Sequence, residues 1–302
     1  MPDKRFNIWT MDFDTPYEGQ IHAILEFLVS HKTAFQKMDV VITHGYGKAL
    51  LLDGRIQSSQ KDEYIYHESL VHPVMISGER PVRVLVVGGG EGSTLREVLR
   101  YPSVEEAVMV DIDREVVEAC KIHLPEFHQG AFDDPRTRVI IDDGRAYIQN
   151  SGERFDVVIL DIPEPTEGGP AYALYTAEFY RLVKNVLSDG GRVVTQACTS
   201  SITMVDNFSV ICNTVAEVFG SVQPYHCFIP SFGYTWGFAL WSPGIDDMAA
   251  LDVDVRLRKY GLPELKFYDE VTNRSLFSLP RDVRKIVSEE TRVFFDENPP
   301  HI

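Results

Sequence analysis

Acidic side chains follow the ends of four successive apolar runs in this sequence. They are Glu91 after the run 82–87, Asp111 after 106–110, Asp142 and Asp143 after 138–141, and Asp161 after 155–160. Ligands of open α/β sheets bind outside the carboxyl ends of the strands, where such residues would converge. One polar residue at a strand end is ordinary, but four in succession predict an acidic pocket for a cationic ligand.

The first of these runs leads into a glycine-rich turn, Gly88-Gly89-Gly90-Glu91-Gly92. Glycines permit tight backbone geometry and let a ligand approach the start of the following helix. The turn departs from the dinucleotide fingerprint, because Ser93 stands where the third glycine belongs and Glu91 would repel a pyrophosphate. We therefore predict a nucleoside that lacks phosphates and carries positive charge, such as S-adenosylmethionine or a relative of it.

The neighbouring acids fit such a nucleoside. Asp111 lies about 20 residues beyond the glycine turn, where an acid holds ribose hydroxyls in nucleotide-binding folds. Asp143 is then expected to bind the adenine amino group, and Glu91 to lie near the positively charged arm.

The segment from Asp161 to Pro170 (DIPEPTEGGP) carries the residues we expect to act on a second substrate. A sulfonium group leaves as a neutral thioether, whereas an attacking amine with a pKa of about 10 arrives protonated. A carboxylate must bind that amine and accept its proton, without need of a metal. We expect Asp161 in this role, aided by desolvation and Tyr66, with Glu164 and Glu167 holding further ammonium groups.

Other features exclude several function classes. The chain has 29 Lys and Arg against 45 Asp and Glu, a net charge of −16 that disfavours nucleic acid. His67 and His72, like His123 and His128, are five residues apart and share a helix face poorly, which argues against a metal site. No membrane-spanning run or secretory signal is visible, so a cytoplasmic protein with reduced cysteines is expected.

Two types of pattern divide the chain. Short β-like runs at 40–43, 48–52 and 55–58 predict a small antiparallel domain over residues 1–75, which ends with a helical pattern at 61–76. From residue 76 to 302, apolar runs alternate with helical patterns, which is typical of βαβ units around a buried parallel sheet. The last runs, 224–229 and 237–241, predict an antiparallel edge.

Several blocks in the same order resemble the polyamine aminopropyltransferases, the spermidine synthase family. They are QSSQKDEYIYHESLVH at 57–72, GGGEGSTLREVL from Gly88, MVDID around Asp111, and the loop at Asp161. The resemblance implies an N-terminal β-domain followed by a Rossmann-like domain of the class I methyltransferase type, with a mostly parallel seven-stranded sheet. It also implies decarboxylated S-adenosylmethionine as co-substrate, methylthioadenosine as product, no permanently bound cofactor or metal, and a homodimer or homotetramer.

The resemblance assigns roles to individual residues. Contacts to the nucleoside are implied for Gln36, Gly88, Gly90, Glu91, Asp111, Asp143, Gly144 and Pro170. Contacts to the polyamine or the aminopropyl arm are implied for Tyr66, His67, Glu91, Asp161, Glu164, Phe232 and Trp236. Asp161 matches the family's proton acceptor.

Two segments resemble the thermospermine synthase subtype, EPTEGGPAYALYT from Glu164 and IPSFGYTWG, which contains Phe232. Spermidine is therefore the expected acceptor, although Glu164 stands where aspartate is usual. The alternatives are putrescine or agmatine as acceptor, an S-adenosylmethionine-dependent methyltransferase, and a polyamine sensor without catalytic activity.

Overall fold

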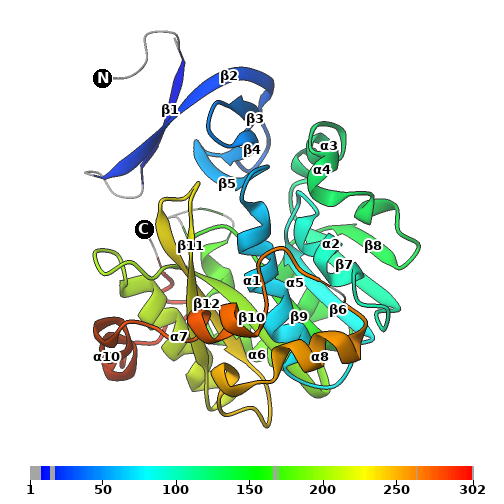
Figure 1. Ribbon diagram of the computed structural model, residues 1–302, viewed down its shortest axis with the longest axis vertical. Coiled ribbons are helices and arrows are strands. Elements are labelled where there is room, and N and C mark those ends of the chain that lie inside the picture. Colours follow the sequence, from blue (N-terminus) through cyan, green and yellow to red (C-terminus); the bar gives the residue numbers. More distant parts are fainter. Residues whose placement is uncertain (1–7, 14–17, 166–168, 170, 263, 301–302) are drawn as a thin grey trace.

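The computed structural model describes residues 8–13, 18–165, 169, 171–262 and 264–300. Within these ranges the chain forms two β-sheets, a small N-terminal sheet and a large sheet flanked by helices (Figure 1). The expectations for Glu167 and Pro170 lie outside the described residues.

The N-terminal sheet is antiparallel, with the order β1-β2-β3-β4-β5. Its strands are β1 Trp9–Phe13, β2 Gly19–Lys32, β3 Lys37–Thr43, β4 Gly47–Leu52 and β5 Arg55–Ser59. Asp53 and Gly54 form the turn between β4 and β5 with φ angles of 49° and 85°, a conformation that these residue types tolerate. The sequence patterns indicated β3, β4 and β5 but did not single out β1 or β2.

The large sheet has seven strands among the described residues, in the order β11-β12-β10-β9-β6-β7-β8, which confirms the expected fold class. The strands are β6 Arg83–Gly88, β7 Glu106–Asp111, β8 Thr137–Ile141, β9 Phe155–Asp161, β10 Leu187–Thr199, β11 Gln223–Ile229 and β12 Tyr234–Trp241. Neighbouring strands in the series β10-β9-β6-β7-β8 pair in parallel. Strands β11 and β12 form the expected antiparallel edge next to β10. The strand order reverses at β6, which pairs with β7 and β9, so this switch point is where a ligand is expected.

Alternate residues of the central strands face two helical layers. Val84 and Val86 pack in one core cluster with residues of α1, α2, α8 and α9, whereas Leu85 and Val87 pack with α5, α6, α7 and α10. The helices are α1 Glu63–Ile76, α2 Ser93–Leu99, α3 Arg114–His123, α4 Pro125–His128, α5 Gly144–Asn150, α6 Ala177–Val186, α7 Asp206–Phe219, α8 Val253–Tyr260, α9 Glu270–Leu276 and α10 Arg281–Glu289.

Helix α1 connects the two sheets and packs on the large one. The buried Arg192 side chain binds the carbonyl oxygens of Val74 and Met75 at 2.7 and 2.9 Å and so satisfies the last turn of the helix. The buried His72 Nε2 lies 3.0 Å from Glu97 Oε2 of α2. These contacts fix α1, and with it the residues that its first turns direct toward the sheet edge.

The described residues contain no helix that is long and apolar enough to cross a membrane. The cytoplasmic location stays a prediction.

Candidate active site

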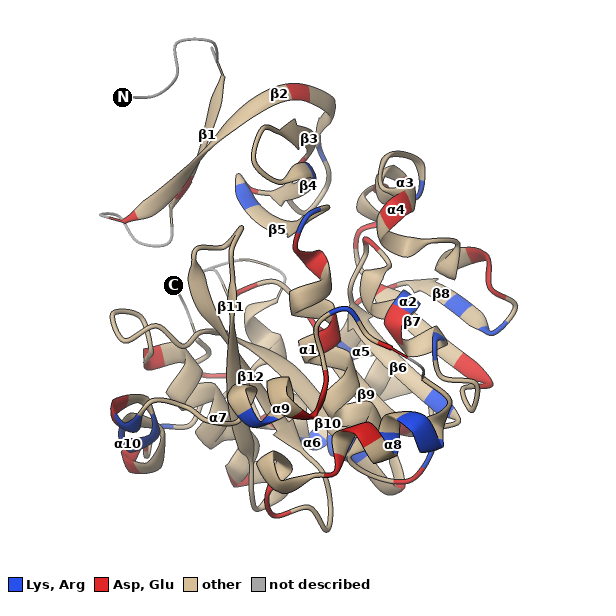
Figure 2. Cartoon of the chain, in the orientation of Figure 1, with Lys and Arg blue, Asp and Glu red and all other residues tan. Residues whose placement is uncertain are grey.

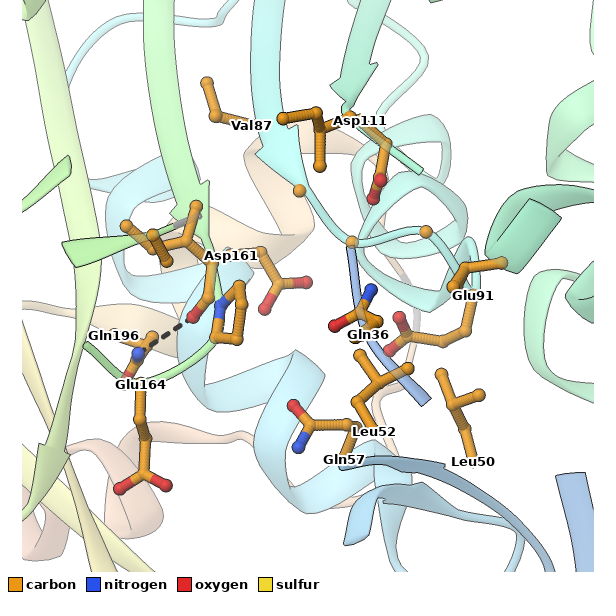
Figure 3. Close-up of a pocket in the computed structure, with 18 of the residues that line it drawn as sticks. Gln36, Leu50, Leu52, Gln57, Val87, Glu91, Asp111, Asp161, Glu164 and Gln196 are labelled. Atoms are coloured by element: carbon orange, nitrogen blue, oxygen red, sulfur yellow. Dashed lines mark hydrogen bonds between the residues drawn. The ribbon is translucent and has the colours of Figure 1, made fainter. Parts of the chain in front are cut away.

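A pocket lies at the carboxyl ends of β6, β7 and β9, between the large sheet and the N-terminal sheet (Figure 3). Every predicted site residue within the described ranges lines this pocket except His67. The lining residues from that set are Gln36, Tyr66, Gly88, Gly90, Glu91, Asp111, Asp143, Gly144, Asp161, Glu164, Phe232 and Trp236. The chain therefore brings together residues that its sequence separates by as many as two hundred positions, and their individual roles stay predictions.

Asp161, the last residue of β9, is held by two hydroxyl groups. Tyr66 Oη donates to Asp161 Oδ1 at 2.7 Å, and Thr94 Oγ1 donates to Asp161 Oδ2 at 2.6 Å. Gly88, the register partner of Asp161 on β6, has a φ of 80°, and a Cβ atom there would collide with the backbone oxygen of Asp161. The glycine thus allows the close strand contact that places the carboxylate in the pocket.

The pKa shifts of Asp161 and Tyr66 indicate different roles for the two residues. Burial raises the pKa of Asp161, and the charge of Glu91 raises it further. Burial also raises the pKa of Tyr66 well above its ordinary value, and the neighbouring Asp161 carboxylate adds to the rise. Tyr66 therefore stays a neutral hydrogen-bond donor, and the raised pKa of Asp161 makes its carboxylate the better proton acceptor of the pair.

His67 is 1% exposed and lies behind the pocket wall. Its Nδ1 is 3.0 Å from Glu63 Oε2, and its Nε2 is 2.8 Å from Glu91 Oε1. Burial alone would lower the pKa of His67, but the hydrogen bonds to the two carboxylates raise it to about 10. His67 is thus an imidazolium that positions the Glu91 carboxylate. Acidic residues lie on the first half of α1 (Figure 2), and Glu63 among them contacts His67.

Ligand atoms of His67, Glu91 and Asp161 lie within 4.8 Å of one another, a spacing that could hold a metal ion. A metal-binding imidazole must be unprotonated. Both ring nitrogens of His67 face carboxylates, at 3.0 and 2.8 Å, and this pairing favours a site for an organic cation.

The nucleoside side of the pocket centres on Asp111. Its Oδ1 accepts a hydrogen bond from the Asp113 backbone N–H at 2.8 Å. A Cβ atom at Gly90 would lie 2.8 Å from Asp111 Oδ2, so only glycine leaves this oxygen accessible from the turn. Burial raises the pKa of Asp111 to about 7, and the negative charges of Asp113, Glu91 and Asp161 add to the rise.

Gln36 and Asp143 are each held by a hydrogen bond. Gln36 Nε2 donates to Asp113 Oδ2 at 3.2 Å, which leaves its carbonyl group for a ligand. Asp143 Oδ1 caps α5 by accepting from the Ala146 N–H at 2.7 Å. Asp142, the other acid after β8, does not line the pocket.

The opposite side of the pocket carries aromatic and charged groups. The Phe232 ring lies 6.1 Å from the Tyr66 ring and 5.0 Å from the Trp236 ring, measured between centroids. Glu164 forms an ion pair with Arg55 of β5, and its carboxylate points away from Asp161 (Figure 3). The aromatic rings offer an apolar surface to methylene groups, and the ion pair links the loop after β9 to the N-terminal sheet.

Sequence patterns did not single out several side chains of this site, among them Asp12, Arg55, Thr94 and Gln196. Thr94 stands at the start of a helix after the glycine turn, and this position could have indicated it. Gln196 Nε2 supports the loop by donating to the Ile162 carbonyl oxygen at 2.8 Å. Asp12 and Arg55 lie on N-terminal strands without a local motif.

Two family models match the chain. The "Spermine/spermidine synthase domain" matches residues 63–249, and the "Spermidine synthase tetramerisation domain" matches residues 8–60.

The chain is also similar to curated proteins and solved structures over nearly its whole length. It is 43% identical to "Polyamine aminopropyltransferase 2" of Hyperthermus butylicus over 97% of each chain. It is 41% identical to "Polyamine aminopropyltransferase" of Sulfolobus acidocaldarius over 96% of this chain and 97% of that protein. A spermidine synthase solved with the transition state analogue AdoDATO superposes with a TM-score of 0.88 at 31% identity, covering 95% of this chain and 97% of that one. The spermidine synthase of Thermotoga maritima gives 0.86 at 30% identity, over 95% and 96%.

Proposed function

This chain belongs to the spermine/spermidine synthase family, and from that premise we propose that it converts spermidine to thermospermine. The coarser activity follows from the family: the chain is a polyamine aminopropyltransferase, which transfers the aminopropyl group of decarboxylated S-adenosylmethionine to a polyamine. The acceptor, the release of methylthioadenosine and the residue roles below are our proposal.

The position of Asp161 carries the proposed mechanism. The acceptor nitrogen attacks the methylene carbon next to sulfur, the carbon–sulfur bond breaks with its electrons passing to sulfur, and methylthioadenosine leaves neutral. The attacking amine must lose a proton, and Asp161 accepts it while Tyr66 and Thr94 hold the carboxylate in place. Glu91, oriented by His67, places a negative charge beside the sulfonium and the reacting amine.

The nucleoside is assigned to the side of the pocket formed by the ends of β6, β7 and β8. Asp111 binds the ribose hydroxyls, Gln36 and Asp143 bind the rest of the nucleoside, and the glycines at 88, 90 and 144 leave room for it. These roles agree with the burial of Asp111 next to an unobstructed glycine turn.

The acceptor is assigned to the side formed by Tyr66, Glu164, Phe232 and Trp236. The methylene groups of a polyamine pack on the aromatic rings, and its ammonium groups meet carboxylates at intervals along the pocket. The extension of the lining as far as β1 and β5 supports an acceptor longer than a diamine.

The family model over residues 8–60 indicates an oligomer. An exposed apolar face on the β1-β2 hairpin supports this, because Met11, Phe13 and Ile21 are 60%, 53% and 59% exposed. We propose that this face joins copies of the chain into a homodimer or homotetramer.

Steady-state kinetics with spermidine, putrescine and agmatine test the proposed acceptor. The proposal predicts the highest kcat/KM with spermidine and a product that co-elutes with thermospermine rather than its isomer spermine. A higher kcat/KM with putrescine or agmatine would overturn the choice of acceptor and leave aminopropyl transfer intact.

A further inference from the structure

The turn between β11 and β12 reaches from the large sheet to the N-terminal sheet (Figure 1). It consists of residues 230–233 and carries Phe232, which lines the side of the pocket assigned to the acceptor. The Phe232 ring packs on the core of the large sheet and also on the N-terminal cluster that contains Val41, Ala49 and Leu51. The position of this ring therefore depends on how both sheets hold the turn.

Two side chains of the N-terminal sheet donate hydrogen bonds to carbonyl oxygens of the turn. Gln20, on β2, donates from Nε2 to the Phe232 carbonyl oxygen. Tyr46, between β3 and β4, donates from Oη to the Pro230 carbonyl oxygen at 2.9 Å. Gly233 leaves room for the first contact, since a Cβ atom there would collide with the Gln20 amide. The N-terminal sheet thus holds the turn on both sides of the residue that precedes Phe232.

A carboxylate at the start of α1 holds the same turn. Asp62 is 4% exposed, and its Oδ2 accepts a hydrogen bond from the Ser231 N–H at 2.7 Å. The N–H groups of Phe232 and Gly233 donate to the Ile229 carbonyl oxygen at 3.1 and 2.9 Å. Buried backbone groups require such partners. Contacts local to the turn satisfy two of its N–H groups, and the contacts from outside satisfy the third N–H and two carbonyl groups.

We propose that Gln20, Tyr46 and Asp62 form a clamp, a set of positioning residues that act through Phe232 to set acceptor selectivity. The inference rests on the proposed function, because it takes Phe232 as part of the acceptor subsite. All three clamp residues lie outside the lining of the pocket. A methylene chain gains dispersion energy from an aromatic ring at contact distance, and a displacement of about 1 Å forfeits much of it. A ring released from the clamp would hold a long acceptor less tightly and distinguish it less from a short one.

Gln20→Ala tests the clamp by removing one of its donors. We expect the KM for spermidine to rise by about 3- to 10-fold, while the KM for decarboxylated S-adenosylmethionine stays within about 2-fold of wild type. The ratio of kcat/KM for spermidine to that for putrescine should fall by a similar factor. Gln149→Ala, the same change at an exposed position of α5, is the control and should leave these values unchanged. A fall in kcat with both KM values unchanged indicates loss of folded enzyme alone and would overturn the proposal.

A double-mutant cycle tests whether the clamp acts through the ring. Phe232→Ala should raise the spermidine KM by itself. Adding Gln20→Ala to it should then change this KM by less than about 2-fold, because the side chain that the clamp positions is already absent. Additive effects of the two substitutions would give Gln20 a separate role and contradict our inference.

Tyr46→Phe provides a second test that does not require Gln20→Ala to fold. It removes the hydroxyl that binds the Pro230 carbonyl oxygen and keeps the ring. The spermidine KM should again rise while the KM for decarboxylated S-adenosylmethionine does not, and an unchanged spermidine KM would contradict the clamp.

Failure of the proposed function gives a different result. An unchanged acceptor KM in Phe232→Ala alone would refute the acceptor subsite, whereas additivity in the cycle would refute the clamp and leave the subsite intact. If putrescine or agmatine proves to be the better acceptor, the same KM comparison is made with that amine.

Discussion

The hydroxyl of Tyr66 donates a hydrogen bond of 2.7 Å to Asp161 Oδ1, which joins the helix between the two sheets to the end of the central strand β9. Asp161 needs such a partner because it is buried beside the charge of Glu91. The contact holds the carboxylate in the pocket, and the raised pKa of Tyr66 keeps the tyrosine protonated, which supports the proposed role of Asp161 as proton acceptor.

Tyr66→Phe removes this hydrogen bond and keeps the aromatic ring. We expect kcat to fall by about 10- to 100-fold, the effect of losing a hydrogen bond to a charged group. The KM for decarboxylated S-adenosylmethionine should stay within about 3-fold of wild type, because Tyr66 lies on the acceptor side. Steady-state kinetics measure both, and an unchanged kcat would show that Thr94 alone suffices to orient Asp161.

Asp111→Asn should weaken methylthioadenosine binding by about 10- to 100-fold, because two ribose hydroxyls lose a charged acceptor. The pKa of Asp111 is raised to about 7, so the carboxylate is protonated below that value and ionised above it. Wild-type affinity for methylthioadenosine, measured by calorimetry, should therefore rise as the pH increases through about 7. A pH-independent wild-type affinity, or an Asn variant altered only in amine preference, would refute the ribose role.

His67→Gln should remove a pH-dependent contribution to stability. The folded-state pKa of His67, about 10, lies above the ordinary value of 6.5. The stabilisation is therefore complete below about pH 6.5 and is lost as the pH rises toward about 10. The difference in unfolding free energy between wild type and variant, measured in urea, should shrink over that window. A constant difference would mean that His67 contributes by packing alone.

Charged substitutions on the β1-β2 hairpin should disrupt the assembly. Met11→Lys with Ile21→Lys places two charges on the exposed apolar face and should yield a smaller species in light scattering after size exclusion. Ile122→Lys on α3, an exposed apolar residue outside this face, is the matched control and should leave the mass unchanged. Equal masses for all three proteins would rule out the hairpin as the interface.

The acids at the strand ends were predictable because parallel strands present their carboxyl ends at one edge. The positions of Asp111, Asp143 and Asp161 follow from apolar runs alone, and the structure places all three on one pocket. The glycine turn could also be predicted from the sequence, because Gly88 and Gly90 stand where a side chain would meet an aspartate.

Contacts between the two sheets could not be derived in the same way. The burial of the Asp12 side chain depends on the pairing of β1 with β2, and neither strand has a distinctive sequence pattern. The ion pair of Arg55 with Glu164 joins residues 109 positions apart. The substrate contact expected of His67 stays a prediction. Its ring nitrogens lie against Glu63 and Glu91, an arrangement that requires knowledge of how α1 packs on α2.

The single-turnover rate of Asp161→Asn tests the account most directly. Enzyme in excess over decarboxylated S-adenosylmethionine and saturated with spermidine reports the transfer step itself. Loss of the proton acceptor should slow this step by about 100- to 10,000-fold while methylthioadenosine affinity stays close to that of wild type. A variant that transfers the aminopropyl group within about 10-fold of the wild-type rate would contradict Asp161 as the acceptor of the amine proton.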